Sequence, residues 1–145
     1  MNGRRFSMCV AIGAAAALFV AAPVHAQTKI ERTPAKPISS VQGVDSFKAY
    51  CASCHGPSAK GDGPAAKALT KAPADLTTIA KRHGGTFSAA DVENTIRGTN
   101  ELTAHGSRDM PIWGPVFDAI SANDKAVVQL KVTNLVNYLK SIQVQ

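Results

Sequence analysis

Two cysteines and a histidine stand within five residues of one another in the stretch AYCASCHGPS. Cys51, Cys54 and His55 are residue types that bind zinc, form a disulfide or attach haem covalently. A structural zinc ion needs four ligands, usually supplied as two separated pairs, and this stretch supplies at most three. His83 or His105 would have to complete such a site, so the spacing does not favour zinc.

The spacing C-x-x-C-H favours covalent haem attachment. One helical turn followed by an adjacent imidazole places both thiols and His55 on the same side, where they could meet the edge of a macrocycle and its iron. A thioredoxin-like motif would begin a helix after a strand, whereas this pair ends a helical pattern. A plain structural disulfide, common in exported proteins, would leave His55 and the glycine-rich residues after it without a role.

Met110 is the second candidate iron ligand, in the stretch DMPIWGPVF. It is the only methionine after residue 26 and lies 55 residues beyond His55. A lone methionine usually fills a core, but Pro111 and the pair Gly114-Pro115 predict a rigid loop that turns here. We therefore expect the Met110 thioether to lie opposite His55. A site with two histidine ligands, using one of the two other histidines named above, is the alternative.

The elements that position these residues are predicted to be helices, because apolar residues recur at helical spacing and no alternating strand pattern appears. Five helical segments are expected. The first three are one at 41–50 leading into Cys51, one or two turns at 65–69, and a short one after Asp75 that Gly84-Gly85 ends. The fourth runs from a capping box at Ser88 to Gly98, and the fifth follows a capping box at Ser121 and carries the apolar stripe Val128, Val132, Leu135, Leu139 and Ile142. The predicted fold is all-α, with short helices and long loops at 55–64 and 98–113 that a central group must organise.

The first 26 residues have the layout of a secretory signal peptide. Two arginines precede 13 uncharged, mostly apolar residues at 10–22, and Val24-His25-Ala26 predicts cleavage after Ala26. Thirteen residues span about 20 Å of helix, short of the ~30 Å hydrocarbon core of a bilayer. An uncleaved membrane anchor is therefore the less favoured alternative, and we expect a periplasmic protein without stable membrane insertion.

The rest of the chain is expected to contain a flexible leader at 27–40, which mixes charges, prolines and serines, and one domain at 41–145. Sixteen Lys and Arg against ten Asp and Glu give a formal charge of +6, and removal of Arg4 and Arg5 with the signal peptide leaves +4. This excess is spread along the chain, without the clustered basic stripe of a nucleic-acid-binding protein. No nucleic acid partner is expected.

Over nearly all of the chain after residue 26, the sequence resembles a class I c-type cytochrome, a small bacterial protein with one haem. In that family the helix before C-x-x-C-H carries Gly-x3-aromatic-x3-Cys, matched by Gly43, Phe47 and Cys51, and the last helix carries Leu-x2-Tyr, matched by Leu135 and Tyr138. The resemblance implies a cytochrome c fold, in which these two helices cross at near right angles and the glycine permits their close approach. The four-helix cytochromes c′ differ because they carry C-x-x-C-H near the C-terminus.

The resemblance also implies roles for residues around the haem. The family usually has a proline whose carbonyl accepts a hydrogen bond from Nδ1 of the iron-ligating histidine, here His55. Pro64 is the candidate for this proline and Pro73 is the alternative. Trp113 could donate its indole N–H to a haem propionate or form a wall of the pocket. Arg97 could face a propionate or stand exposed on its helix.

The implied function is electron transfer in the periplasm by one haem c, attached through Cys51 and Cys54, with His55 and Met110 as the axial ligands of the iron. The implied protein is a monomer that exchanges electrons with a dehydrogenase, reductase or oxidase and is not itself an enzyme. The alternative is a haem c subunit or dedicated electron acceptor of a periplasmic dehydrogenase or reductase. A gas sensor or peroxidase would need an open sixth position at the iron, and Met110 argues against it.

Overall fold

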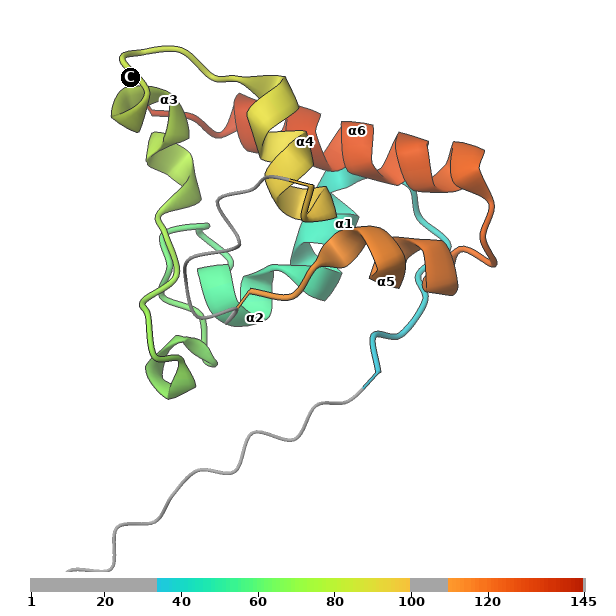
Figure 1. The fold of residues 1–145 in the computed structure, drawn as a ribbon. Helices are drawn as coiled ribbons and strands as arrows, with labels where there is room; N and C mark the ends of the chain where they lie inside the picture. The colour runs from blue at the N-terminus through green and yellow to red at the C-terminus, as the bar shows by residue number, and fades with distance from the viewer. Residues whose placement is uncertain (1–33, 100–109, 145) are drawn as a thin grey trace, which may run out of the picture.

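A computed structural model describes residues 34–99 and 110–144, and in these ranges the chain is helical with no strand. The elements in chain order are α1 (Gly43–Tyr50), α2 (Ala52–His55), the 3-10 helices η1 (Ala66–Ala68) and η2 (Leu76–Thr78), α3 (Ile79–Arg82), α4 (Ala89–Arg97), α5 (Trp113–Ile120) and α6 (Lys125–Ser141). Figure 1 shows α1 passing behind α6, while the chain from α2 to α3 forms the left side of the view. The prediction of an all-α fold is confirmed.

The contact between α1 and α6 depends on a glycine. A Cβ atom at Gly43 would collide with the carbonyl oxygen of Asn134 and would lie 2.8 Å from Cβ of Tyr138. One turn further along α1, the ring of Phe47 is buried and its centroid lies 5.3 Å from that of Tyr138. The predicted close approach of these two helices at Gly43 is therefore confirmed.

The apolar stripe of α6 forms one side of the core. Val128, Val132, Leu135 and Leu139 are each at most 4% exposed, as expected for residues that recur every three or four positions on one helical face. Ile142, the last predicted member of the stripe, follows the helix and is half-buried. The stripe packs together with buried side chains of the other helices, which are Phe47, Tyr50, Ile96 and Phe117.

The capping residues of α4 are those that the sequence predicts, whereas α6 begins at a different cap from the predicted one. Ser88 accepts a hydrogen bond from the Asp91 N–H, and Gly98 ends α4 in the left-handed region at φ 74°. The predicted cap of α6 at Ser121 is wrong, because Asp124 accepts from the N–H groups of Ala126 and Val127. The carboxylate of Asp124, three residues later, thus serves as the N-cap in place of Ser121. The Ser121 hydroxyl is buried without a hydrogen-bond partner.

The structure contains a helix, α5, where the sequence predicted a turning loop. Pro115 is the third residue of α5, within its first turn. The N–H groups of the first turn have no acceptor inside the helix, so a proline at this position removes no intrahelical hydrogen bond. Gly114 permits close packing instead of a turn, because a Cβ atom there would lie 2.8 Å from the Arg97 carbonyl oxygen. The predicted loop at 98–113 ends where α5 begins, and only the turn expected at Gly114-Pro115 is replaced by helix. Residues 100–109 lie outside the described ranges.

The described residues of the predicted flexible leader pack against the domain. The Lys131 side chain, 2% exposed, donates from Nζ to the Ile38 carbonyl at 2.7 Å. The Tyr50 hydroxyl donates to the Lys36 carbonyl at 3.0 Å and accepts from the Ile38 N–H at 3.2 Å. Residues 34–40 are thus held by hydrogen bonds to α1 and α6, whereas residues 27–33 and the predicted signal peptide lie outside the described ranges.

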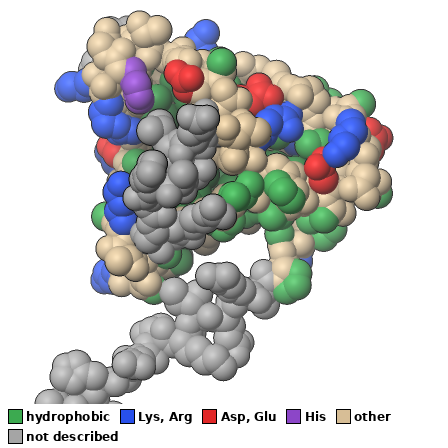
Figure 2. Space-filling view, viewed as in Figure 1, with side chains coloured by type: hydrophobic (Ala, Val, Ile, Leu, Met, Phe, Trp, Pro, Cys, Tyr) green, Lys and Arg blue, Asp and Glu red, His purple; other side chains and the backbone are tan. Residues whose placement is uncertain are grey.

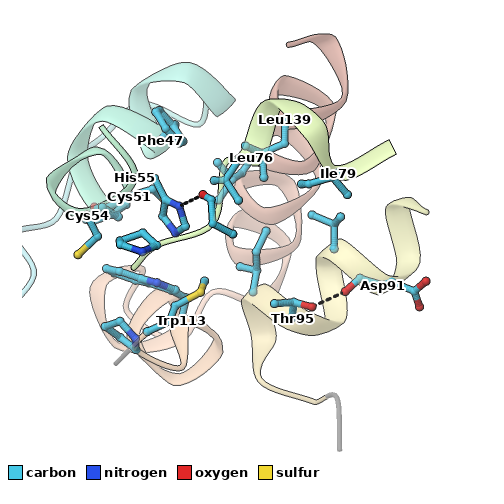
Figure 3. A pocket seen from close by; sticks show the side chains of 18 of the residues that line it. Phe47, Cys51, Cys54, His55, Leu76, Ile79, Asp91, Thr95, Trp113 and Leu139 are labelled. Carbon is cyan, nitrogen blue, oxygen red and sulfur yellow. Dashed lines mark hydrogen bonds between the residues drawn. The ribbon is translucent and has the colours of Figure 1, made fainter. Parts of the chain in front are cut away.

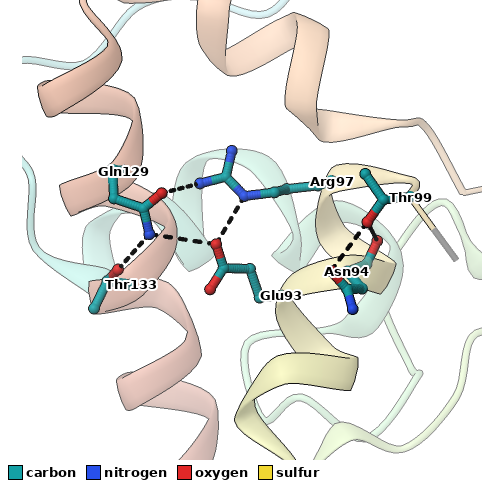
Figure 4. Close-up of polar contacts among 6 residues, drawn as sticks. All are labelled: Glu93, Asn94, Arg97, Thr99, Gln129 and Thr133. Atoms are coloured by element: carbon teal, nitrogen blue, oxygen red, sulfur yellow. Dashed lines mark hydrogen bonds and ion pairs between the residues drawn. The ribbon is translucent and has the colours of Figure 1, made fainter.

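A polar network attaches α4 to α6 (Figure 4). Arg97 pairs with Glu93 at 2.8 Å and donates to the Gln129 side chain at 2.7 Å, and Gln129 donates to Glu93 at 3.3 Å. The hydrogen bond from Arg97 is the main reason that the pKa of Glu93 lies below its ordinary value. None of the helices in the described ranges is long and apolar enough to cross a bilayer.

The glycine in α1 gives a first prediction. Gly43→Ala should destabilise the protein by about 3 kcal/mol, the upper end of the usual cost of overpacking, because the new methyl group meets the backbone of α6. Gly84→Ala is the control: its methyl group would meet no atom within 4 Å, so only the positive φ of 65° opposes it. Urea unfolding followed by circular dichroism measures both, and equal losses of stability would contradict a packing role for Gly43.

The cap of α6 gives a second prediction. Asp124→Ala should cost about 1 kcal/mol, the usual value of a lost N-cap. Ser121→Ala should leave stability unchanged or raise it slightly, because the Ser121 hydroxyl is buried without a hydrogen bond and its removal ends an unfavourable desolvation. The same unfolding measurement compares the two variants, and a greater loss for Ser121→Ala would restore Ser121 as the cap.

Candidate functional site

A cavity of about 740 Å³ lies between the helices and is lined by side chains of α1, η2, α3, α4, α5 and α6, together with the turn at α2 (Figure 3). Most of its wall is apolar, including Phe47, Leu76, Ile79, Leu135 and Leu139. Fewer of the side chains that line the cavity are polar or chemically reactive. The cavity therefore suits a large, flat, mostly apolar group that is fixed by a small number of specific contacts.

The two cysteines lie on one wall of this cavity. Cys51 ends α1 and Cys54 lies in α2, one turn further along, and both are free thiols that line the cavity. The N–H groups of Cys54 and His55 donate to the Cys51 carbonyl at 3.1 and 2.9 Å. This turn brings Cys51, Cys54 and His55 to the same cavity, as the spacing of the motif predicts.

The described residues around the thiols do not complete a zinc site. Burial, with a smaller contribution from the neighbouring Cys54, raises the pKa of the Cys51 thiol to about 12. Within residues 34–99 and 110–144, no three His, Cys, Asp or Glu side chains are grouped to hold a metal ion by themselves.

His55 is held by one nitrogen and free at the other. Its Nδ1 lies 3.0 Å from the Ala74 carbonyl oxygen, which can only accept, so Nδ1 carries the proton and Nε2 keeps a lone pair. Burial lowers the pKa of His55, and the hydrogen bond to Ala74 opposes part of that shift. The imidazole is therefore neutral at neutral pH, in the form that can bind iron through Nε2.

The predicted partner of His55 is wrong in detail. Pro64 does not line the cavity, because its neighbours Gly63 and Ala65 hold it beside α2 by hydrogen bonds to the Cys54 and Ser53 carbonyls. Pro73 lines the cavity, but its carbonyl faces Gly61, where a Cβ atom would collide with it. The next carbonyl along the chain, that of Ala74, bonds to His55 instead. A main-chain acceptor can come from any residue type, so only the neighbouring Pro73 hinted at this position.

Met110 lines the cavity from the segment before α5, and Trp113 lines it from the first turn of α5. Met110 is 42% exposed. Trp113 begins α5, and its ring lies 5.7 Å from that of Tyr50 and 5.9 Å from that of Phe117. Figure 3 shows Trp113 and His55 entering the cavity from different helices. Trp113 thus forms a wall of the pocket, which is one of its two predicted roles.

Of the remaining residues that the sequence suggested, some line the cavity and others do not. Arg97 does not line the cavity and bonds to Glu93 and Gln129 instead. His83 lines the cavity near its rim and is exposed, with Nδ1 2.8 Å from the Ile79 carbonyl. His105 lies outside the described residues. Sequence reasoning missed Arg82, which lines the cavity and donates to the Asp75 carbonyl at 2.7 Å. Its position about two turns after the predicted cap at Asp75 was the available signal.

These residues fit a covalently attached haem. Two thiols on one wall could hold the edge of the macrocycle, the adjacent neutral imidazole could approach its iron, and the apolar walls could contact its faces. The fit rests on this donor set and on the size of the cavity, which exceeds the lower range of cofactor pockets, about 300 Å³.

Comparison with known proteins agrees with this fit. No curated protein sequence and no solved structure matches the chain. The family model described as Cytochrome c matches residues 40–143, which include the whole of the described cavity. Proteins of this family transfer electrons by means of covalently attached haem c, and the Cys51–Cys54 pair is consistent with the C-x-x-C-H attachment motif. The chain therefore belongs to the cytochrome c family, and its cofactor is haem c.

Proposed function

We propose that this protein is a periplasmic electron-transfer protein of the class I type, in which His55 and Met110 hold the iron of a single haem c from its two faces. When bound, haem c supplies the one-electron couple between Fe(II) and Fe(III). The observation that carries the proposal is the cavity itself, which is lined by Cys51, Cys54, His55 and Met110 although Met110 is distant from the others in the sequence.

Each residue of the chain has a distinct task in this proposal. Cys51 and Cys54 tether the cofactor, so it stays with the protein in both oxidation states. His55 presents Nε2 because Ala74 holds the proton on Nδ1. Met110 supplies a weakly basic thioether that favours the ferrous state and raises the reduction potential. The buried apolar walls exclude water, which also favours the less charged state of the site.

The partners we propose are redox proteins with acidic docking surfaces, which the protein meets as a monomer. Residues 60–82, next to the cavity, contain five Lys or Arg and two Asp. Two of these cations, Lys71 and Arg82, line the cavity, and Figure 2 shows Lys and Arg side chains along the edge of the molecule where α3 lies. Such a field attracts an acidic partner and speeds its association at low salt.

Met110 gives the third prediction. In the oxidised protein, Met110→Ala should abolish the charge-transfer absorption of methionine-ligated haem and lower the reduction potential, because the thioether that favours Fe(II) is lost. The reduced variant should also bind carbon monoxide readily, since the sixth position is then open. Absorption spectroscopy and redox titration measure these changes.

The matched control is Leu130→Ala, which removes a side chain of comparable exposure, 46% against 42%, from a residue that does not line the cavity. It should keep the wild-type spectrum and potential. If the wild-type ferric protein lacks the methionine band, or Met110→Ala keeps it, Met110 is not the ligand. One of the histidines would then be the next candidate.

The cysteines give the fourth prediction. Cys51→Ala and Cys54→Ala should each retain haem through the remaining thioether, whereas the double variant should release haem into acidified organic solvent. Ser53→Ala, between the two cysteines, should behave as the wild type. Mass spectrometry of the denatured proteins checks each case, and haem extracted from the wild type would contradict attachment through these residues.

A further inference from the structure

The chain beyond α6 is bonded to the segment that carries the hydrogen-bond acceptor of His55. Gln143 accepts at Oε1 from the Ala80 N–H at 2.9 Å and donates from Nε2 to the Leu76 carbonyl at 2.8 Å. The next residue, Val144, donates its backbone N–H to the Thr77 carbonyl at 2.8 Å. Figure 1 shows this end of the chain beside α3. Three hydrogen bonds thus join the C-terminal residues to η2 and α3.

The amide of Gln143 uses both of its ends. Besides its bond to Leu76, Nε2 donates to the Leu139 carbonyl at 2.7 Å, which anchors the side chain to α6. The Ala80 N–H lies in the first turn of α3, where no side chain of the N-cap residue Thr78 serves it. Gln143 therefore supplies an acceptor that this short helix lacks. No other uncharged side chain of this size offers one acceptor and two donors in this geometry.

The segment held by Gln143 begins two residues after Ala74. On its other side, the Leu76 N–H donates to the carbonyl of the buried residue Ala59 at 2.7 Å. Leu76 is thus fixed through its N–H to Ala59 and through its carbonyl to Gln143. Because Ala74 is separated from Leu76 by a single residue, the direction of its carbonyl depends on these two attachments.

We propose that Gln143 is a positioning residue for His55: by fixing the segment 76–80 it holds the Ala74 carbonyl on Nδ1 of His55 and so helps to set the reduction potential. This inference rests on the proposed function, in which His55 binds the iron. A strong hydrogen bond from Nδ1 makes the imidazole a better electron donor, and a better donor stabilises Fe(III). Loosening of the Ala74 carbonyl should therefore raise the reduction potential.

Two variants of the haem-loaded protein test this role. Gln143→Leu keeps the approximate size of the side chain and removes all three hydrogen bonds. Gln143→Glu keeps an acceptor for Ala80 but sets a carboxylate oxygen against the carbonyls of Leu76 and Leu139. Its added negative charge, acting through space, would by itself lower the potential. A rise in both variants therefore distinguishes positioning from simple electrostatics.

The control is Gln129→Leu, the same substitution at a glutamine within α6. Gln129 bonds to Glu93, Arg97 and Thr133 (Figure 4), and none of these residues lines the cavity. It should lose some stability without changing the potential. Any effect of a merely weakened fold would appear in this control.

Two measurements test the positioning role of Gln143. Redox titration should show a more positive midpoint for both Gln143 variants, by up to a tenfold change in the Fe(II)/Fe(III) equilibrium, which is about 59 mV for one electron. NMR of the reduced protein should show the His55 Nδ1 proton exchanging with solvent about fivefold faster, as expected for loss of one ordinary hydrogen bond's stabilisation.

The outcomes distinguish the positioning role of Gln143 from the proposed function. If wild-type and Gln129→Leu proteins share the spectrum of a His55-ligated haem, and the Gln143 variants change neither potential nor proton exchange, the positioning role is wrong while the proposed function stands. If His55→Ala leaves the wild-type spectrum intact, His55 is not the ligand. That result would overturn the proposed function and the role of Gln143 together.

Discussion

The close approach of α1 to α6 at Gly43 is the constraint on which the site depends. Because α1 cannot move away from α6 without exposing Phe47 and the apolar stripe, its C-terminal end is fixed in space. The turn with Cys51 and Cys54 begins at that end, so the position of both thiols follows from a contact two helical turns away. A side chain at Gly43 would therefore displace the attachment turn as well as the helix.

His55 adds a second constraint that originates elsewhere in the chain. Its ring orientation depends on a carbonyl 19 residues later, at Ala74. The segment with Ala74 forms only one or two turns of helix, too short to be stable by itself. Ala59, Asp75 and Gln143 accept hydrogen bonds from backbone N–H groups of this segment, which stabilises it where helix propagation cannot. These polar contacts thus help to fix the direction of this carbonyl.

The sequence predicts the parts of this structure that rest on side-chain periodicity or on rare residue types. The stripe of α6, the caps at Ser88 and Gly98, and the C-x-x-C-H turn all belong to this group. Prediction from the sequence fails where hydrogen bonds of backbone groups determine the local structure. The Ala74 carbonyl has no side-chain signature, and Gly114-Pro115 has the composition of a turn although it lies in the first turn of α5. The packing of residues 34–40 was missed for the same reason, because backbone groups of that segment bond to Tyr50 and Lys131.

Helix α6 links these constraints. Near its C-terminal half it meets α1 at Asn134 and Tyr138, near its N-terminal half Gln129 joins it to α4, and beyond its last turn Gln143 joins it to η2 and α3. Three walls of the cavity are therefore positioned against one rigid element of 17 residues. A change in the bonds at one end of α6 reaches the cavity only through the wall attached there, because each wall has its own contact with the helix. For this reason Gln129, within α6, and Gln143, beyond its last turn, have different consequences for the site.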